Sequence, residues 1–247
     1  MHQLTGGGAE STPSLRGSKA TEAIQNTPSQ KPLRILEIGC NSGNFLRMLQ
    51  ESKMIKKYNC ELFGIDLDSN AISQAKEIAA KNGDSTQFFT LAAENIKELG
   101  ISFDIIACFE VIEHLINPAP FMKSIYENLN KGGYFIFTTP NALGLEIQAI
   151  GYNKRRLQAH AIFPPMHLNA FSTHNILYFA KKHNFALSYF DTPGRLDMSA
   201  LTHSIKELEN ENLKKITHFS DEIKAYMQYL VAYLKASSHM RVVYRKQ

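Results

Sequence analysis

One stretch, residues 33–46 (LRILEIGCNSGNFL), constrains the fold of this chain more than any other. It begins as an apolar, partly β-branched run, typical of a buried strand, and it ends in the apolar spacing of a helix. Gly39 and Gly43 bracket the turn between them, where the backbone must approach something closely. Glu37 is a carboxylate on the apolar strand, and it needs a partner because an unpaired buried charge is costly. The stretch therefore predicts a nucleoside-binding turn between a strand and a helix.

Strand patterns alternate with helix patterns along most of the remaining chain. Helices are expected after several of the strands, the first of them capped by Ser42 or Asn41, and residues 92–96 are expected to form a loop. Such alternation predicts a parallel sheet with right-handed crossovers, in which ligands bind outside the carboxyl ends of the strands. The predicted strands are residues 33–38, 60–68, 87–91, 103–109, 134–141, 185–191 and 239–245.

Composition indicates a globular protein and argues against nucleic-acid-binding, membrane-spanning and secreted proteins. The net charge is +4, from 27 basic and 23 acidic residues, which is too mild and dispersed to favour nucleic-acid binding. The three cysteines, Cys40, Cys60 and Cys108, form no C-x-x-C pair, so we expect reduced thiols in a cytoplasmic protein. No apolar run is long enough to span a bilayer, and the first residues lack the apolar region of a secretory signal.

Three segments depart from the alternating pattern. Residues 1–30 are rich in Gly, Ser, Thr, Gln and Pro and are expected to form a flexible leader before one domain, residues 31–247. Residues 142–170 and 199–237 are predicted to be insertions on the substrate side. Within the second insertion, apolar residues recur at helical spacing over 203–236. We expect that face to pack on the domain, with a lid or a homodimer surface as the alternatives.

The chain from Leu33 to Arg245 resembles the class I S-adenosylmethionine-dependent methyltransferases. The resemblance is carried by the acid-containing first strand with its Gly-rich turn, by Asp66 after the second strand, and by residues 103–115 and 129–133. That region is similar to the ubiquinone-biosynthesis O-methyltransferases. Residues 164–197 resemble methyltransferases found with bacterial surface-polysaccharide synthesis.

This resemblance implies a specific α/β fold. The expected architecture is a Rossmann-like, doubly wound, seven-stranded sheet, mostly parallel with an antiparallel last strand, and with a helical insertion before that strand. Asn41 stands where relatives usually carry glycine. Asparagine tolerates left-handed backbone angles better than most residues, so we expect the turn to be kept.

The resemblance also implies the cofactor S-adenosylmethionine and its contacts. The first turn lacks the G-x-G-x-x-G spacing of a pyrophosphate cradle, which independently favours a ligand without phosphates. Glu37 is expected to order the turn or to reach the methionine ammonium group, and Asp66 to accept from the ribose hydroxyls. Glu94 is expected beside the adenine. The implied cofactor residues are Glu37, Gly39, Cys40, Asn41, Gly43, Asp66, Leu67, Ala93, Glu94, Phe109 and Glu110.

A Glu-x-x-Glu-His run, formed by Glu110, Glu113 and His114, follows the fourth strand. Together with His167 it resembles the Mg²⁺-binding set of the small-RNA 3′-end 2′-O-methyltransferases, in which a cation would lower the pKa of an acceptor hydroxyl. The same residues only shape the loop in metal-free relatives, and we predict no metal. His114 and His167 are candidate general bases because imidazole titrates near neutrality, with a structural role as the alternative for each.

These observations predict an enzyme that methylates a hydroxyl. Because the methyl group of the donor is already activated, holding donor and acceptor in line supplies most of the catalysis. The expected acceptor is a small sugar or glycan-related hydroxyl, which rests on resemblance alone. The alternatives are a quinone-type or aromatic O-methyltransferase, an RNA 2′-O-methyltransferase with magnesium, and a non-catalytic S-adenosylmethionine-binding protein.

Overall fold

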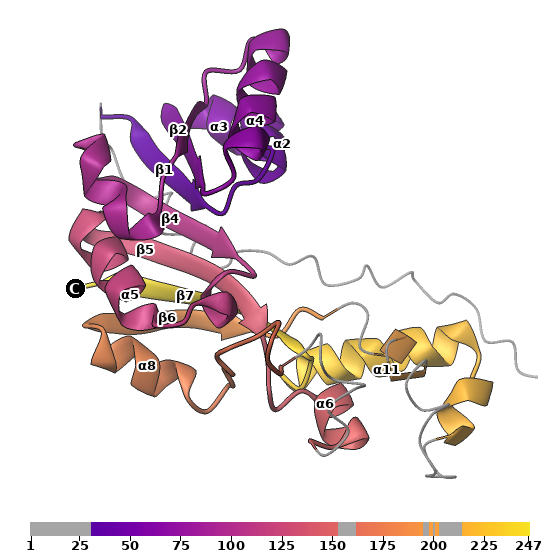
Figure 1. Cartoon of the computed structure of the whole chain (residues 1–247). Helices are drawn as coiled ribbons and strands as arrows, with labels where there is room; N and C mark the ends of the chain where they lie inside the picture. Colours follow the sequence, from indigo (N-terminus) through magenta and orange to yellow (C-terminus); the bar gives the residue numbers. More distant parts are fainter. Residues whose placement is uncertain (1–30, 153–161, 195–197, 200, 203–213) are drawn as a thin grey trace, which may run out of the picture. The chain divides into compact units, whose positions relative to one another are not determined.

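The computed structural model describes residues 31–152, 162–194, 198–199, 201–202 and 214–247. These residues form an α/β domain around one mixed sheet (Figure 1). The predicted leader lies outside the described residues.

Seven strands form the sheet in the order β3-β2-β1-β4-β5-β7-β6. Strand β7 is antiparallel to both of its neighbours, whereas the other pairs are parallel. The strands are β1 (Leu33–Ile38), β2 (Cys60–Asp66), β3 (Gln87–Thr90), β4 (Phe103–Phe109), β5 (Leu129–Pro140), β6 (Phe185–Asp191) and β7 (His239–Lys246). This topology confirms the predicted doubly wound sheet with an antiparallel last strand.

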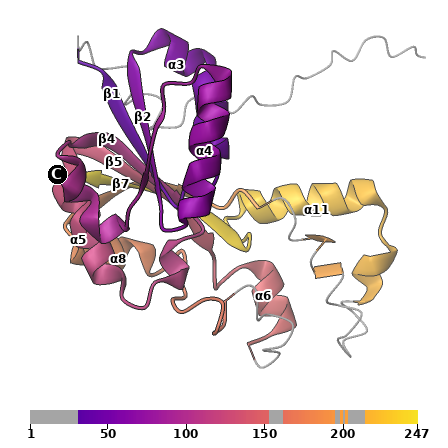
Figure 2. The same cartoon turned by 45° about the horizontal axis from the view of Figure 1, so that its top comes forward.

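Helices cover both faces of the sheet. Figures 1 and 2 show α2 and α4 on one face and α5 and α8 on the other. The described α-helices are α2 (Asn44–Glu51), α3 (Lys53–Lys57), α4 (Ser69–Asn82), α5 (Pro118–Asn128), α6 (Leu145–Ile150), α8 (Ile176–Lys182) and α11 (Asp221–Tyr233). Three short 3₁₀ helices accompany them: η1 (Ala93–Leu99), η2 (Ile112–His114) and η3 (Lys215–His218).

Local capping chemistry explains several helix boundaries. The carboxylate of Asp68 accepts a hydrogen bond from the N–H of Asn70 (2.8 Å) and caps α4, which ends at Gly83 with a left-handed φ of 63°. Helix α5 begins at Pro118, and the side chain of Asn117 caps it. Each of these helices therefore begins and ends where its flanking sequence dictates.

Two local predictions were wrong. Helix α2 has Gly43 at its N-cap position, and its first turn has no side-chain cap. Asn41 cannot serve there because its side-chain oxygen accepts from the N–H of Ser42 (2.6 Å), within the tight turn. The predicted loop at residues 92–96 is instead the start of η1, which buries Ile96 against the core.

The main core lies between the sheet and its helices, where aromatic side chains pack both stacked and edge to face. Phe135 and Phe137 of β5 and Tyr244 of β7 are fully buried, and the hydroxyl of Tyr244 donates to the carbonyl of Ile176 (2.6 Å). A second, much smaller cluster joins α6 to α11. It contains Ile150, Met198, Leu201 and Val231.

The second cluster lies beyond the carboxyl ends of the parallel strands (Figure 1). Hydrogen bonds fasten it to the sheet: Asn141 N–H donates to the carbonyl of Ser238 (2.6 Å), and Leu145 N–H to that of Ala236 (2.7 Å). The helices after β5 and before β7 therefore rise from the edge where ligands bind in sheets of this kind. Within the described residues, no helix is long and apolar enough to cross a membrane.

Candidate active site

The turn after β1 has an unusual backbone. Gly39, Asn41 and Gly43 have φ values of 72°, 47° and 77°, so left-handed residues alternate through it. A Cβ atom on Gly43 would lie 2.7 Å from the ring of Phe88, and one on Gly39 would lie 2.9 Å from Val111. Asn41 adopts the left-handed angle expected of it. Glycine is therefore required at both flanking positions for space as well as for conformation.

Asp66, at the end of β2, holds this turn in place. One carboxylate oxygen accepts from the N–H of Asn41 (2.8 Å), and the other accepts from the N–H of Asp68 (2.9 Å). The carbonyl of Ile65 accepts from the N–H groups of Gly39 and Cys40. Each carboxylate oxygen has a second lone pair, so Asp66 can still accept from two ligand hydroxyls.

Glu37 is a buried carboxylate beneath the same turn. Its side chain is 4% exposed, and its Oε2 atom accepts no hydrogen bond from the described residues. Burial, together with the nearby charge of Asp66, raises the pKa of Glu37 to about 8. Burial and the same two carboxylates raise the pKa of the Cys40 thiol to about 12. A cationic ligand group at this position would complete the coordination of Glu37 and favour its ionised form.

Glu110 begins the segment after β4 in a strained conformation. Its φ is 54°, which is unusual for a residue with a side chain. Its carboxylate lies 3.3 Å from Nε2 of His239, the first residue of β7. Although burial opposes it, hydrogen bonds from His239 and Thr138 lower the pKa of Glu110. His239 is not among the residues predicted for the site, because only the antiparallel pairing of β7 with β5 brings it to this edge.

Glu113, His114 and His167 form a cluster in which one potential ligand atom from each residue lies within 4.8 Å of the others. The carboxylate of Glu113 is fully buried. Its Oε2 accepts from the hydroxyl of Thr139 (3.0 Å), whereas Oε1 accepts no hydrogen bond from the described residues and lies 3.9 Å from Nε2 of His114. The centroids of the His114 and His167 rings are 4.7 Å apart. Burial raises the pKa of Glu113 to about 7.

The segment carrying His167 is fastened to η2 through backbone contacts. The carbonyl of Glu113 accepts from the N–H groups of Leu168 (2.8 Å) and Asn169 (2.9 Å). Nδ1 of His114 lies 2.6 Å from the carbonyl of Met166. A carbonyl can only accept, so Nδ1 carries the proton in neutral His114, and Nε2 is left to accept a proton or bind a cation.

The predicted four-residue set is thus divided in space. Glu113, His114 and His167 meet, whereas the carboxylate of Glu110 is directed to His239. Another histidine, His174, is exposed before α8 and is not part of the cluster, whereas His160, Arg155 and Arg156 lie outside the described residues.

Comparison with known proteins gives the family. A family model described as a methyltransferase domain matches residues 15–189, which is well over half of the chain. The chain belongs to the class I S-adenosylmethionine-dependent methyltransferases. We infer that the turn after β1, with Glu37 below it and Asp66 beside it, is the cofactor region of this methyltransferase.

Sequence relatives of this methyltransferase include ubiquinone biosynthesis O-methyltransferases. The protein from Sinorhizobium fredii is 31% identical over 111 residues, which are 45% of this chain and 42% of the relative. The protein from Burkholderia vietnamiensis is 32% identical over 110 residues, or 44% of each chain. The chain thus spans less than half the length of these relatives in the matched region.

Solved structures share the fold at low identity. A Haemonchus contortus phosphoethanolamine N-methyltransferase 2 in complex with S-adenosyl-L-methionine has a TM-score of 0.57 and 17% identity, with 93% of this chain and 53% of that chain covered. The [4+2]-cyclase SpnF has a TM-score of 0.57 and 14% identity, with 92% and 79% covered. One fold thus carries proteins named for different reactions, so the acceptor chemistry must be sought in the site itself.

The remaining predicted cofactor residues lie along the same edge. Leu67 is 76% exposed, which leaves an apolar side chain next to Asp66 for a ligand to cover. Phe109 packs edge-on against Phe45, with ring centroids 4.7 Å apart. Glu94 is exposed in the first turn of η1, and the carbonyl of Ala93 accepts from the hydroxyl of Ser124 (2.6 Å). This arrangement suits a ligand with a cationic end over Glu37 and an apolar ring near Leu67.

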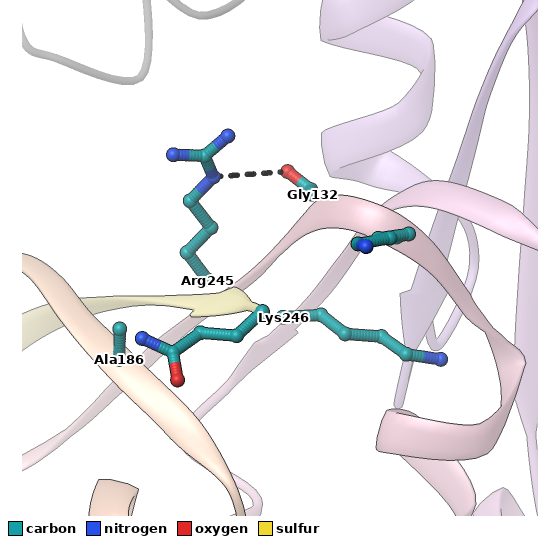
Figure 3. A pocket seen from close by; sticks show the side chains of 6 residues that line it. Gly132, Ala186, Arg245 and Lys246 are labelled. Atoms are coloured by element: carbon teal, nitrogen blue, oxygen red, sulfur yellow. Dashed lines mark hydrogen bonds between the residues drawn. The ribbon is translucent and has the colours of Figure 1, made fainter.

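A pocket of about 410 Å³ at the opposite edge of the sheet is not part of this site (Figure 3). It lies where β5 and β6 begin and β7 ends, and Arg245 there donates to the carbonyl of Gly132. The ammonium group of Lys246 donates to the carbonyls of Tyr126 (2.6 Å) and Leu129 (2.7 Å). The cationic groups of Arg245 and Lys246 are thus engaged by backbone oxygens.

Proposed function

We propose that this methyltransferase transfers the methyl group of S-adenosylmethionine to a hydroxyl of a small molecule held at the Glu113–His114–His167 cluster. The observation that carries the proposal is the cluster itself: two imidazoles and a buried carboxylate whose Oε1 atom accepts no hydrogen bond from the described residues. Its first residue, Glu113, follows β4 closely in the chain, with two residues between it and Glu110. An acceptor bound there would lie beside the predicted methionine side of the donor.

The cluster can remove the proton that the acceptor loses. Nε2 of His114 is the free acceptor atom of a ring that is 44% exposed, so a substrate hydroxyl can reach it. Glu113 lies on the same side and would stabilise the imidazolium as it forms. S-adenosylmethionine supplies an activated methyl group, so the chain needs only to align the hydroxyl and accept its proton.

The donor set of the cluster also fits a divalent cation. Two imidazole nitrogens and one carboxylate oxygen are a common ligand set for first-row divalent metals, and a cation would neutralise the buried charge of Glu113. Such a cation would lower the pKa of a bound hydroxyl and make a nearby base less important. Sensitivity to chelators therefore distinguishes a metal-assisted reaction from one in which His114 is the base.

The acceptor class is proposed from similarity. Residues 164–197 resemble methyltransferases of surface-polysaccharide synthesis, which favours a sugar or glycan-related hydroxyl. A phenolic acceptor is the second candidate, because the relatives that match this chain at 31–32% identity are named ubiquinone biosynthesis O-methyltransferases. Both classes present neighbouring oxygens, which suits a cluster of three polar side chains.

The test is methyl transfer from labelled S-adenosylmethionine to a panel of sugars, catechols and short RNAs, with and without chelator. We expect a methylated sugar or phenol to form, and Glu113→Gln and His114→Asn to abolish it while S-adenosylmethionine still binds. His174→Asn is the matched control, because His174 lies outside the cluster. Methylation of RNA alone, or full activity in both cluster variants, would contradict the proposal.

Loss of activity in chelator, with recovery on adding Mg²⁺ or Mn²⁺, would identify the metal-assisted version. Full activity in chelator would leave His114 as the proton acceptor. Binding of the donor without transfer to any class in the panel would favour the non-catalytic alternative.

A further inference from the structure

Helix α11 exposes an apolar and aromatic face. Among the described residues, sixteen large hydrophobic side chains are exposed, and seven of them lie between residues 219 and 234. They are Phe219, Ile223, Tyr226, Tyr229, Leu230, Tyr233 and Leu234, called here the α11 face. A concentration of this kind on one short segment marks an interaction surface rather than scattered exposure.

Among the described residues, the opposite side of α11 makes few buried apolar contacts. Val231 is the one buried residue of α11, and it packs into the small cluster with Ile150, Met198 and Leu201. This cluster is separate from the main core of the sheet. Within α11, five large apolar side chains are exposed and Val231 is buried, so a partner on the α11 face would bury more of these side chains than the fold itself does.

We propose that the α11 face pairs with the same face of a second copy of this chain. A two-fold interface needs a self-complementary patch, and this patch has Tyr226 near its middle, with Phe219 and Leu234 at its two ends. Antiparallel pairing brings the acidic first turn, which holds Asp221 and Glu222, towards Lys235 of the second copy, whose ammonium group also donates to the carbonyl of Phe190 in its own chain (2.9 Å). The two ends thus carry opposite charges.

The exposed area matches what a dimer needs. The tyrosines at 226, 229 and 233 are 64%, 60% and 72% exposed, and the other four side chains are 38–70% exposed. At roughly 180 Å² for a large side chain, the face offers about 700 Å² in each copy. A stable interface takes about 800 Å² from each partner, so the face supports a reversible dimer of standard size. Its tyrosines also suit a protein interface, where they are enriched.

The charge pattern argues against a lipid surface as the occupant. Helices that lie on membranes carry several lysines and arginines along the polar side, whereas α11 carries two acidic residues, Asp221 and Glu222, and one basic residue, Lys224. A second copy thus fits the face better than an anionic bilayer does.

The experiment measures the mass of the full chain in solution over a hundredfold concentration range by sedimentation equilibrium. We expect a concentration-dependent shift from 27.8 kDa towards twice that mass. Tyr226→Glu, and separately the triple change of Tyr226, Tyr229 and Tyr233 to Ser, should keep the chain monomeric. Leu177→Ser with Tyr178→Ser is the matched control, because these exposed side chains lie on α8, and it should leave dimerisation unchanged.

Three outcomes would overturn the proposal. They are a wild-type chain that stays monomeric over the whole concentration range, a dimer that persists in both α11 variants, and an equal loss of dimerisation in the α8 control. Vesicles of phosphatidylcholine with phosphatidylglycerol form a second arm. Sedimentation of a monomeric wild-type chain with these vesicles, lost in Tyr226→Glu, would assign the face to lipid instead. Circular dichroism and binding of S-adenosylmethionine confirm that each variant is folded, and neither readout depends on the acceptor proposed above.

Discussion

Replacing Glu37 with glutamine tests how the buried carboxylate recognises the donor. In the absence of a ligand, burial and the charge of Asp66 raise the pKa of Glu37 from 4.5 to about 8. A carboxyl group whose pKa is raised on folding costs stability once the unfolded chain ionises. The cost is therefore absent below pH 4.5, grows as the pH rises, and levels off above about pH 8.

The size of this cost follows from the pKa difference. At pH 7.5, three pH units above 4.5, a cost of about 1.36 kcal/mol per unit gives about 4 kcal/mol as an upper value. Glu37→Gln keeps the shape and cannot ionise. We therefore expect the variant to gain up to this amount over wild type at pH 7.5 and to match it near pH 4.5. Urea unfolding at both pH values measures the difference, and Glu98→Gln, at an exposed glutamate, is the control.

The same titration governs affinity for the donor. We propose that Glu37 binds the methionine ammonium group as a carboxylate, so each complex formed well below pH 8 releases close to one proton. The dissociation constant should fall by nearly tenfold per pH unit between pH 5.5 and 7.5, and calorimetry in two buffers should detect the proton. Glu37→Gln should bind more than tenfold more weakly at pH 7.5, with no such pH dependence. A flat wild-type profile with unchanged affinity in the variant would refute this role.

Two further predictions concern the frame of the site. Gly43→Ala should destabilise the fold and weaken donor binding, because its Cβ would lie 2.7 Å from Phe88. Gly83 also has a left-handed φ, but a Cβ there would meet nothing within 4 Å. Gly83→Ala should therefore cost about 1 kcal/mol in urea unfolding and leave donor binding unchanged. Equal losses of stability and donor affinity in the two variants would contradict a steric role for Gly43. His239→Ala should raise KM for the donor severalfold with little effect on kcat, because Glu110 loses its partner. His239→Gln should restore KM. A loss of kcat in both variants would make His239 a catalytic base instead.

The sequence predicted the sheet well because its signals are local. An apolar run, a turn residue and a helix cap lie next to one another, as in the stretch from β1 to α2 and in the cap of α4 by Asp68. The two wrong predictions were also local. The side chain of Asn41 accepts a hydrogen bond within the turn, so it cannot cap α2. The segment predicted as a loop at residues 92–96 instead begins a 3₁₀ helix, which places Ile96 in the core.

The candidate site was predictable only in part. Residues after β1, β2 and β4 meet because parallel strands end at the same edge, so Glu37 and Asp66 could be found from the sequence. His239 could not, since it begins the antiparallel strand β7 and reaches Glu110 only through pairing with β5. The division between Glu110 and Glu113 depends on the left-handed backbone of Glu110, which residue spacing does not encode.

Calorimetric titration of S-adenosylmethionine into the full chain at pH 7.5 tests the central claim most directly. We expect one site per chain, and we expect Asp66→Ala to abolish measurable binding, because that carboxylate orders the turn and is proposed to accept from the ribose hydroxyls. Saturable binding to wild type that is lost in the variant would support the cofactor site described above. No heat of binding to the folded wild-type chain, or equal binding to Asp66→Ala, would contradict it.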